Sequence, residues 1–320
     1  MRKTRLDLIT LLVLGIAGVL GVSTLMSPSA GAASEAQPAA LPPAAETCLS
    51  CHDEPAVTPI LGTPHAVAAD PHSGFAEHGC ATCHGPSLAH MQRPERGSRR
   101  APPDKVFGAA STTPAEAQNA TCLDCHRSGA GMHWQGSTHD HEGLACATCH
   151  RAHTGTDPMQ DATAQSQTCY GCHRSVRTES LRPSHHPLHD ERMACSDCHA
   201  VHGSSGPSLL TRGTVNETCY QCHADLRGPF LWEHPPVRED CLLCHRPHGS
   251  VQASLLRQRG PWLCQQCHMA QFHPSAALSG TGLPGEALPS GSSSMLGRNC
   301  MNCHSQVHGS NHPSGAGFTR

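Results

Sequence analysis

The chain has 320 residues, of which only 3% are aromatic, and its 22 basic and 25 acidic residues give a net charge of −3. So few large apolar side chains cannot fill the core that a chain of this length normally builds. The slight acidic balance argues against nucleic-acid binding, which would require a basic excess. The 20 cysteines and 27 histidines are far above average usage, so their spacing directs the interpretation.

The first 33 residues are typical of an export signal. Three basic residues within the first five precede an apolar run from Leu6 to Met26, and residues 29–33 (SAGAA) form a small-residue cleavage pattern. This order predicts a secretory signal peptide over residues 1–33, cleaved after Ala32 or Ala33. The run is also about long enough for an uncleaved membrane anchor, although the small residues favour cleavage. In both cases residues 34–320 are expected to leave the cytoplasm.

All cysteines fall in ten C-x-x-C-H motifs, with none left over. This is the attachment signature of c-type haem, in which both thiols bond the macrocycle and the histidine ligates the iron on its proximal side. A disulfide scaffold, structural zinc or a thiol redox pair would not require histidine at the fifth position ten times. The predicted haem-attaching cysteines are Cys48, Cys51, Cys80, Cys83, Cys122, Cys125, Cys146, Cys149, Cys169, Cys172, Cys195, Cys198, Cys219, Cys222, Cys241, Cys244, Cys264, Cys267, Cys300 and Cys303. The predicted proximal ligands are His52, His84, His126, His150, His173, His199, His223, His245, His268 and His304.

The motif spacing predicts a repetitive architecture. From Cys122 to Cys264 the first cysteines recur every 22 to 26 residues, which suggests an elongated stack of units with one haem each. Residues 91–121 and 274–299 indicate loops. We expect a multihaem cytochrome c over residues 34–320, mostly coil with short α-helices around ten covalently attached haems and little or no β-sheet. A division into two pentahaem halves stays open.

The remaining 17 histidines could supply a second ligand to every iron. C-H-x-x-H extensions mark His153, His202 and His248, and a longer variant marks His308. A residue three positions on lies on the same helical face as the proximal histidine, so we expect it to reach a neighbouring haem. A second group precedes a motif by seven to nine residues and comprises His139, His186 and His234.

The last three predicted distal ligands are His65, His90 and His273, which lie in long segments between motifs. Competing candidates are His72 and His78 for the place of His65, His133 and His141 for that of His139, and His185 and His189 for that of His186. We expect His312 to be exposed. None of the nine methionines recurs at a fixed offset, so bis-histidine, low-spin haems without an open coordination site are expected.

With these motifs, the chain resembles the periplasmic decahaem cytochromes of outer-membrane electron conduits, the Mtr-type family with its Dms-type relatives. The resemblance covers Cys48 to Arg320 and is most specific in residues 218–250, 263–268 and 300–315. It is weakest in residues 34–47 and 91–121. It implies bis-histidine haems, with a pattern that matches the ten distal histidines and favours His65 over His72. It also implies a periplasmic protein inserted in an outer-membrane β-barrel porin.

The resemblance implies three partners, namely the porin, an outer-surface multihaem cytochrome or reductase, and a periplasmic cytochrome that gives or takes electrons. We therefore expect an electron-transfer wire and not an enzyme. It would link periplasmic carriers with extracellular metal oxides, a dimethyl sulfoxide-type reductase or ferrous iron. A porin would shield polar backbone groups that cannot face lipid. The alternatives are a multihaem oxyanion reductase, which needs an iron with one open face, and a free periplasmic carrier without a porin.

Overall fold

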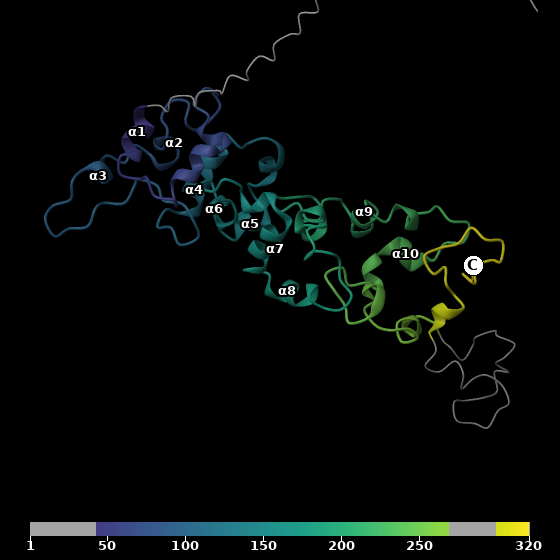
Figure 1. Cartoon of the computed structure of the whole chain (residues 1–320). Coiled ribbons are helices and arrows are strands. Elements are labelled where there is room, and N and C mark those ends of the chain that lie inside the picture. Colours follow the sequence, from purple (N-terminus) through teal and green to yellow (C-terminus); the bar gives the residue numbers. More distant parts are fainter. Residues whose placement is uncertain (1–42, 269–298, 320) are drawn as a thin grey trace, which may run out of the picture. The chain divides into compact units, whose positions relative to one another are not determined.

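The computed structural model describes residues 43–268 and 299–319, all of which belong to one compact unit that runs from Ala39 to Arg320. The predicted signal peptide and His273 lie outside the described residues. Short helices joined by coil make up this part of the chain (Figure 1). Its only extended pairing is four isolated antiparallel bridges. The expected fold class, a multihaem cytochrome c of short helices and coil, is confirmed in these respects.

The α-helices are brief, and the two longest, α4 and α7, have nine residues each. Their bounds are α1 Pro43–Leu49, α2 Ala81–His84, α3 Leu88–Met91, α4 Ala115–Leu123, α5 Thr138–His141, α6 Cys146–Cys149, α7 Ala162–Tyr170, α8 Arg174–Ser180, α9 Val215–Cys219 and α10 Pro235–Glu239. No helix among the described residues combines the length and the apolar character that crossing a membrane requires.

Single 3₁₀ turns supply the remaining helical structure. They are η1 Thr58–Gly62, η2 Pro64–Ala66, η3 Gly129–His133, η4 Pro158–Gln160, η5 Cys195–Asp197, η6 Pro207–Leu209, η7 Ala224–Leu226, η8 Cys241–Leu243, η9 Ala253–Leu255, η10 Cys264–Gln266 and η12 Cys300–Asn302. Four of them, η5, η8, η10 and η12, begin at the first cysteine of a motif. The motifs therefore lie on helical turns, as the sequence predicts.

Local side-chain caps explain where several helices begin. Asp161 accepts a hydrogen bond from the backbone N–H of Ala164 at the start of α7, at 2.7 Å. Thr214 does the same for the N–H of Glu217 at the start of α9, at 3.1 Å. Because a short isolated helix is marginal in water, these caps stabilise the turns that lead into two of the motifs.

Side chains alone do not supply an apolar interior. Among the described residues, seven hydrophobic residues are buried, against twelve polar ones. The largest apolar cluster joins Ala45, Ile60, Ala66 and Phe75 near the N-terminal end of the described chain. This is the deficit that the aromatic content predicts, because a domain of this size normally buries mostly aliphatic and aromatic side chains.

Candidate haem centres

Each C-x-x-C-H motif folds into one helical turn. In all ten, the backbone N–H of the histidine donates to the carbonyl of the first cysteine, at 2.9–3.0 Å. This bond between residues four positions apart places the cysteine side chains and the imidazole on a single turn of backbone. All twenty thiols are free of disulfides. The turn therefore presents two thiols and one imidazole together, which is the donor set that covalent haem requires.

Among the described residues, a second imidazole from a distant part of the chain faces the motif histidine in nine motifs. The ring centres lie 5.8–6.4 Å apart. The pairs, with the motif histidine first, are His52–His90, His84–His153, His126–His65, His150–His202, His173–His139, His199–His248, His223–His186, His245–His308 and His268–His234. Every second member is a histidine that the sequence predicts as a distal ligand.

The spacing of the paired rings suits two imidazoles on opposite faces of one metal ion. Metal–imidazole bonds of about 2.0 Å, plus roughly 1.1 Å from each nitrogen to its ring centre, place the two centres about 6 Å apart. The nine measured separations bracket this value. The residues present therefore fit a six-coordinate haem iron, which would supply one-electron redox chemistry when bound.

Hydrogen bonds fix which ring nitrogen faces the partner. Seven of the paired histidines place Nδ1 against a backbone carbonyl, at 2.7–2.9 Å. They are His84, His90, His139, His186, His199, His234 and His245. A carbonyl only accepts, so Nδ1 carries the proton and Nε2 keeps its lone pair. Metal-ligating histidines need this tautomer when Nε2 binds the metal.

Three paired histidines have a carboxylate near Nδ1. Asp157 lies 2.5 Å from Nδ1 of His150, whereas Glu54 lies 3.3 Å from that of His52. Glu179 lies 3.6 Å from Nδ1 of His248. The His150 contact is much the shortest of the three, whereas seven other paired histidines have a neutral backbone carbonyl at this position.

Burial favours the neutral form of several of the distal histidines. It lowers the pKa of five of them, and the facing motif histidine lowers each pKa further. The five are His65, His153, His202, His248 and His308. A neutral imidazole is the form that binds a metal.

The two histidines that compete with His186 lie elsewhere. His185 directs Nδ1 at the carbonyl of His186, at 2.7 Å, and its ring packs against His189. His189 contacts Tyr170 as well. The structure thus brings His186, and neither neighbour, to His223. In the same way His65 faces His126 and His139 faces His173.

The pairing skips one motif, which the sequence analysis did not foresee. We expected each C-H-x-x-H histidine to reach an adjacent unit, but His202 follows the sixth motif and faces His150 of the fourth. His153, His248 and His308 likewise reach two motifs back. Four of the histidines between motifs, His65, His139, His186 and His234, reach two motifs forward instead, whereas His90 reaches one motif back to His52. Spacing in the sequence places the C-H-x-x-H histidine on the same helical face as its own motif histidine. It does not say how many motifs away its partner lies.

Three of the distal histidines that lie between motifs also contact the C-H-x-x-H segments that carry other distal histidines. Nδ1 of His139 donates to the carbonyl of Val201, the residue before His202, at 2.9 Å. His186 uses Pro247, before His248, and His234 uses Val307, before His308. One C-H-x-x-H segment therefore supplies a distal histidine to one motif and orients the distal histidine of another.

Successive motifs lie side by side along the whole described series. The first cysteines of the third and fourth motifs, Cys122 and Cys146, are close enough for each thiol to shift the pKa of the other. The second cysteines of the second and third motifs, Cys83 and Cys125, are close enough for one thiolate to raise the pKa of the other thiol. Contacts of these two kinds alternate from Cys48 to Cys300.

Three buried amides, which sequence analysis missed, hold paired motifs together. Asn216, three residues before Cys219, accepts from the N–H of Cys241 at 2.8 Å and donates to the carbonyl of Val237 at 2.9 Å. Asn119 occupies the same place before Cys122, and accepts from Cys146 N–H at 2.7 Å. Gln165 bonds the N–H of Ser196. The recurrence of N-x-x-C at two motifs is the signal that could have found them.

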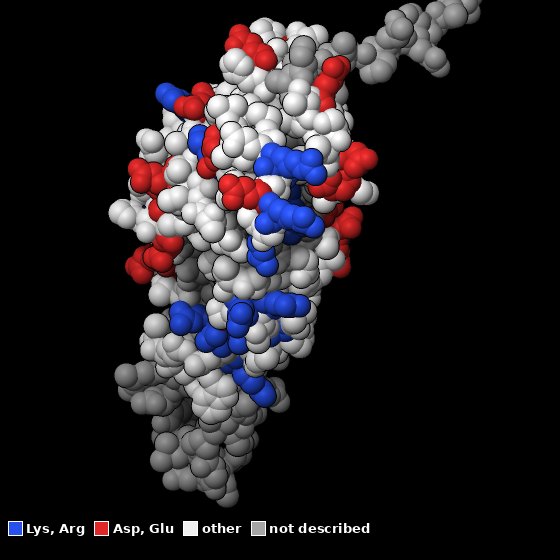
Figure 2. Space-filling model, turned by 90° about the vertical axis from the view of Figure 1, so that its left-hand side faces the viewer, with Lys and Arg blue, Asp and Glu red and all other residues white. Residues whose placement is uncertain are grey.

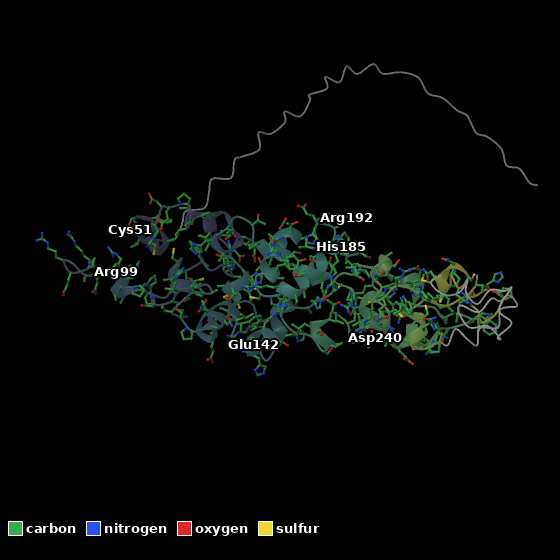
Figure 3. The ribbon with its side chains drawn as sticks, turned by 90° about the horizontal axis from the view of Figure 1, so that it is seen from below. Cys51, Arg99, Glu142, His185, Arg192 and Asp240 are labelled. Carbon is green, nitrogen blue, oxygen red and sulfur yellow. The ribbon has the colours of Figure 1, made fainter. Side chains whose placement is uncertain are left out.

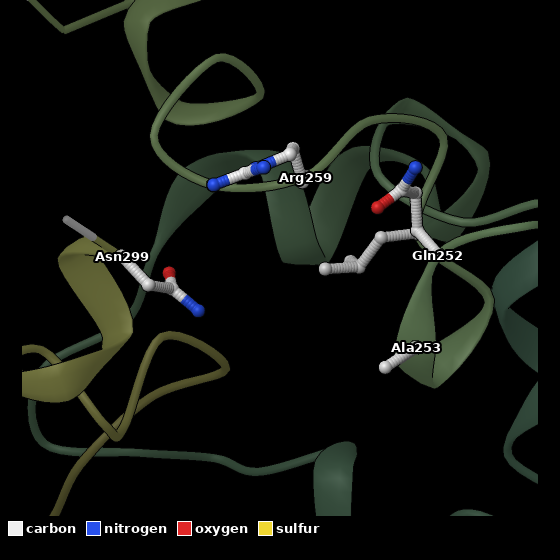
Figure 4. Close-up of a pocket in the computed structure, with 6 residues that line it drawn as sticks. Gln252, Ala253, Arg259 and Asn299 are labelled. Atoms are coloured by element: carbon white, nitrogen blue, oxygen red, sulfur yellow. The ribbon is translucent and has the colours of Figure 1, made fainter. Parts of the chain in front are cut away.

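A small hollow is lined by residues that belong to none of these pairs. Gln252, Ala253, Arg259 and Asn299 line it, with Leu256 and Gly260 (Figure 4). None of the six lining residues is a predicted ligand.

The motif turns and facing imidazoles define a multihaem c-type cytochrome, and comparisons with known proteins agree. Residues 185–228 and 234–273 match a doubled CXXCH motif, and residues 80–167 match a cytochrome c-type protein described as NrfB-like. The chain is 43% identical over 277 residues to the multiheme cytochrome MtrA of Shewanella baltica (strain OS185). The matched region covers 86% of this chain and 80% of the relative.

The chain therefore belongs to the MtrA family of multihaem cytochromes. It binds haem c through its C-x-x-C-H motifs, and it is an electron-transfer protein and not an enzyme.

Proposed function

We propose that the protein carries ten haems and acts as an electron wire through an outer-membrane porin. The observation that carries this proposal is the set of nine facing histidine pairs at 5.8–6.4 Å. With both axial positions taken, an iron has no place for a substrate and serves in electron transfer. The pairs supply the distal ligands of nine motifs, and we assign His273, the tenth distal ligand that the sequence predicts, to the tenth haem.

The haems follow one another in sequence order. Support comes from the alternating cysteine contacts, which join each motif to the one before and the one after. Macrocycles attached to adjacent turns give an electron a series of short steps between the first and last motifs. The protein then contributes axial ligation, burial and spacing, while the haems carry the redox chemistry.

The wire is periplasmic at one end and sheathed by a β-barrel porin. An outer-surface multihaem cytochrome or reductase and a periplasmic cytochrome complete the path to external metal oxides, dimethyl sulfoxide or ferrous iron. Export by the predicted signal peptide over residues 1–33 supports this location. The need of polar backbone to avoid lipid supports the porin.

The test is electron transfer across a sealed membrane. The tagged full chain would be purified from solubilised outer membranes of its host, with whatever barrel protein accompanies it, and reconstituted into liposomes that enclose oxidised methyl viologen. We expect external dithionite to reduce the enclosed dye only when chain and barrel are both present. A chain that copurifies with no barrel and leaves the dye oxidised would be a free carrier instead.

A variant without the seventh haem separates insertion from conduction. Cys219→Ala with Cys222→Ala removes one attachment site in the middle of the series. We expect the barrel complex to form while dye reduction is lost. Unchanged dye reduction in this variant would contradict a single series of haems.

A further inference from the structure

The segment after α3 is the most basic exposed stretch of its length in the described chain. This basic loop, residues 92–100, contains Arg93, Arg96, Arg99 and Arg100 against one acidic residue, Glu95, and all five side chains are exposed. Its local charge of +3 contrasts with −3 for the whole chain. No ion pair within the described residues engages Arg93, Arg96 or Arg99. Figure 2 shows Lys and Arg side chains gathered along the middle of one face, with Asp and Glu to either side.

The base of the loop is tied to a predicted haem ligand. Arg100 donates from Nη1 to the carbonyl of His90 at 2.6 Å and to that of Gln92 at 3.2 Å. In return, Nδ1 of His90 donates to the carbonyl of Ala101 at 2.7 Å. These bonds hold the two ends of the loop together, while Arg99 extends away from the body of the protein (Figure 3). The arginines at the tip are therefore presented outward from a fixed base.

The loop lies at one end of the proposed haem series. The ring of His90 stacks on that of His52, the histidine of the first motif, with centres 5.8 Å apart. An end haem is where electrons enter or leave a wire. Unpaired positive charge around such a point raises the local concentration of acidic molecules and their association rates.

We propose that the basic loop is a docking surface for a soluble electron-transfer protein with an acidic face, which exchanges electrons with the first haem. The proposal rests on the proposed function. One electron passes in each encounter, from the reduced cofactor of the partner to the ferric iron or in the reverse sense, and no bond forms or breaks. The loop supplies steering and orientation and leaves the chemistry to the two cofactors.

The composition of the loop favours a protein partner over other anionic surfaces. Between Gln92 and Ala101 there is no large apolar residue that could insert into a lipid layer. There is also no aromatic residue on which a nucleic-acid base could stack. Anchoring to His90 instead links the charge to a redox centre.

Charge reversal at the tip tests the proposal. The double variant Arg96→Glu with Arg99→Glu leaves Arg100 and its hydrogen bonds in place. The control, Arg174→Glu with Arg177→Glu, alters two exposed arginines that are also three residues apart and have no ion pair in the described structure. Both variants change the net charge equally. The probe is flavodoxin, a small acidic flavoprotein, with its binding to the oxidised haem protein and its electron-transfer rate measured separately.

We expect the loop variant to lose about tenfold in association rate and in affinity for flavodoxin at low ionic strength. The control should stay within about twofold of the wild type, and high salt should abolish the difference. Haem content and dye reduction in the reconstituted conduit should be unchanged in both variants, so a failed docking proposal would leave the conduit standing.

Three results would overturn the proposal. The loop variant could match the wild type, or the control could lose as much as the loop variant, which would indicate attraction by net charge alone. Alternatively, phosphatidylglycerol vesicles could bind the wild type and not the loop variant while flavodoxin distinguishes neither, which would make the loop a lipid contact.

Discussion

At the scale of single residues, the close carboxylate contact at Nδ1 of His150 distinguishes its histidine pair from the others. Nδ1 of His150 faces the carboxylate of Asp157 at 2.5 Å, whereas the equivalent nitrogen of His199 faces a backbone carbonyl at 2.9 Å. A carboxylate draws the proton more strongly, which makes the imidazole a better electron donor to a metal. Stronger donation stabilises the ferric state, so the fourth haem should have a lower potential than a haem whose motif histidine faces a backbone carbonyl.

Replacing Asp157 with Asn should raise the potential of one haem. A weaker hydrogen bond that changes the ferric–ferrous balance by about 1.4 kcal/mol shifts a one-electron potential by roughly 60 mV. A spectroscopic redox titration would show one component moving upward. Asp190→Asn, which alters a surface ion pair with Arg192, is the control and should leave the titration unchanged. Identical curves for all three proteins would contradict a tuning role.

Adjacent histidines provide a test of the distal assignments. The ring of His186 lies 6.4 Å from that of His223, whereas His185 packs on His189. His186→Ala should leave one haem five-coordinate, with a high-spin signal in the electron paramagnetic resonance spectrum, and His185→Ala should not. A high-spin signal in the second variant, or in neither, would show that the pairing is wrong.

At the scale of elements, the repeating unit is a pair of motifs and not a single one. Each pair is joined through its first cysteines, and in three pairs a buried amide spans it as well. The first pair lacks such an amide, and there the buried Ala45 lies against Gly79, where an added Cβ would come within 3.0 Å of Ala45. The regular gaps in the sequence show the motifs but not their grouping.

Asn216→Ala should destabilise the fold. It removes three hydrogen bonds and leaves the N–H of Cys241 and the carbonyls of Val237 and Arg238 without their partner in a buried site. The cost should be about 2–3 kcal/mol, seen as a lower melting temperature of the holoprotein. The control, Asn302→Ala, changes an exposed side chain and should have little effect. Equal melting temperatures for the two variants would refute the role of the amide.

The motifs, the coil-rich fold and nine of the distal histidines could be predicted from the sequence, since the structure places each of these nine against a motif histidine. The sequence cannot give the pairing, because a histidine such as His153 is placed by helical spacing on one face only, and its partner His84 is fixed by how distant turns pack. It favours His186 over His185 only because His186, like His234, directly precedes a proline. Asn119 escapes notice because a single amide has no metal-binding signature.

At the scale of the whole molecule, each pair of motifs contributes distal histidines to neighbouring pairs, and these contacts join the pairs into one series. The segment that holds the fifth and sixth motifs sends His186 forward to His223 and His202 back to His150. Removing one haem should therefore loosen contacts in two neighbouring pairs. At the N-terminal end the pairing differs, because His90 follows the second motif and faces His52 of the first motif, within the same pair of motifs. This difference is expected for the first unit of a repeat, which has a neighbouring unit on one side only.

The central claim is that every iron is held between two histidines in a chain of ten haems. The most direct test combines the intact mass of the holoprotein with the electron paramagnetic resonance spectrum of its oxidised form. We predict a mass increase of ten haems and a wholly low-spin spectrum that small ligands such as nitrite do not change. Fewer haems, or a high-spin signal equal to one haem or more per chain, would contradict the claim and would indicate an open iron on which substrate could bind.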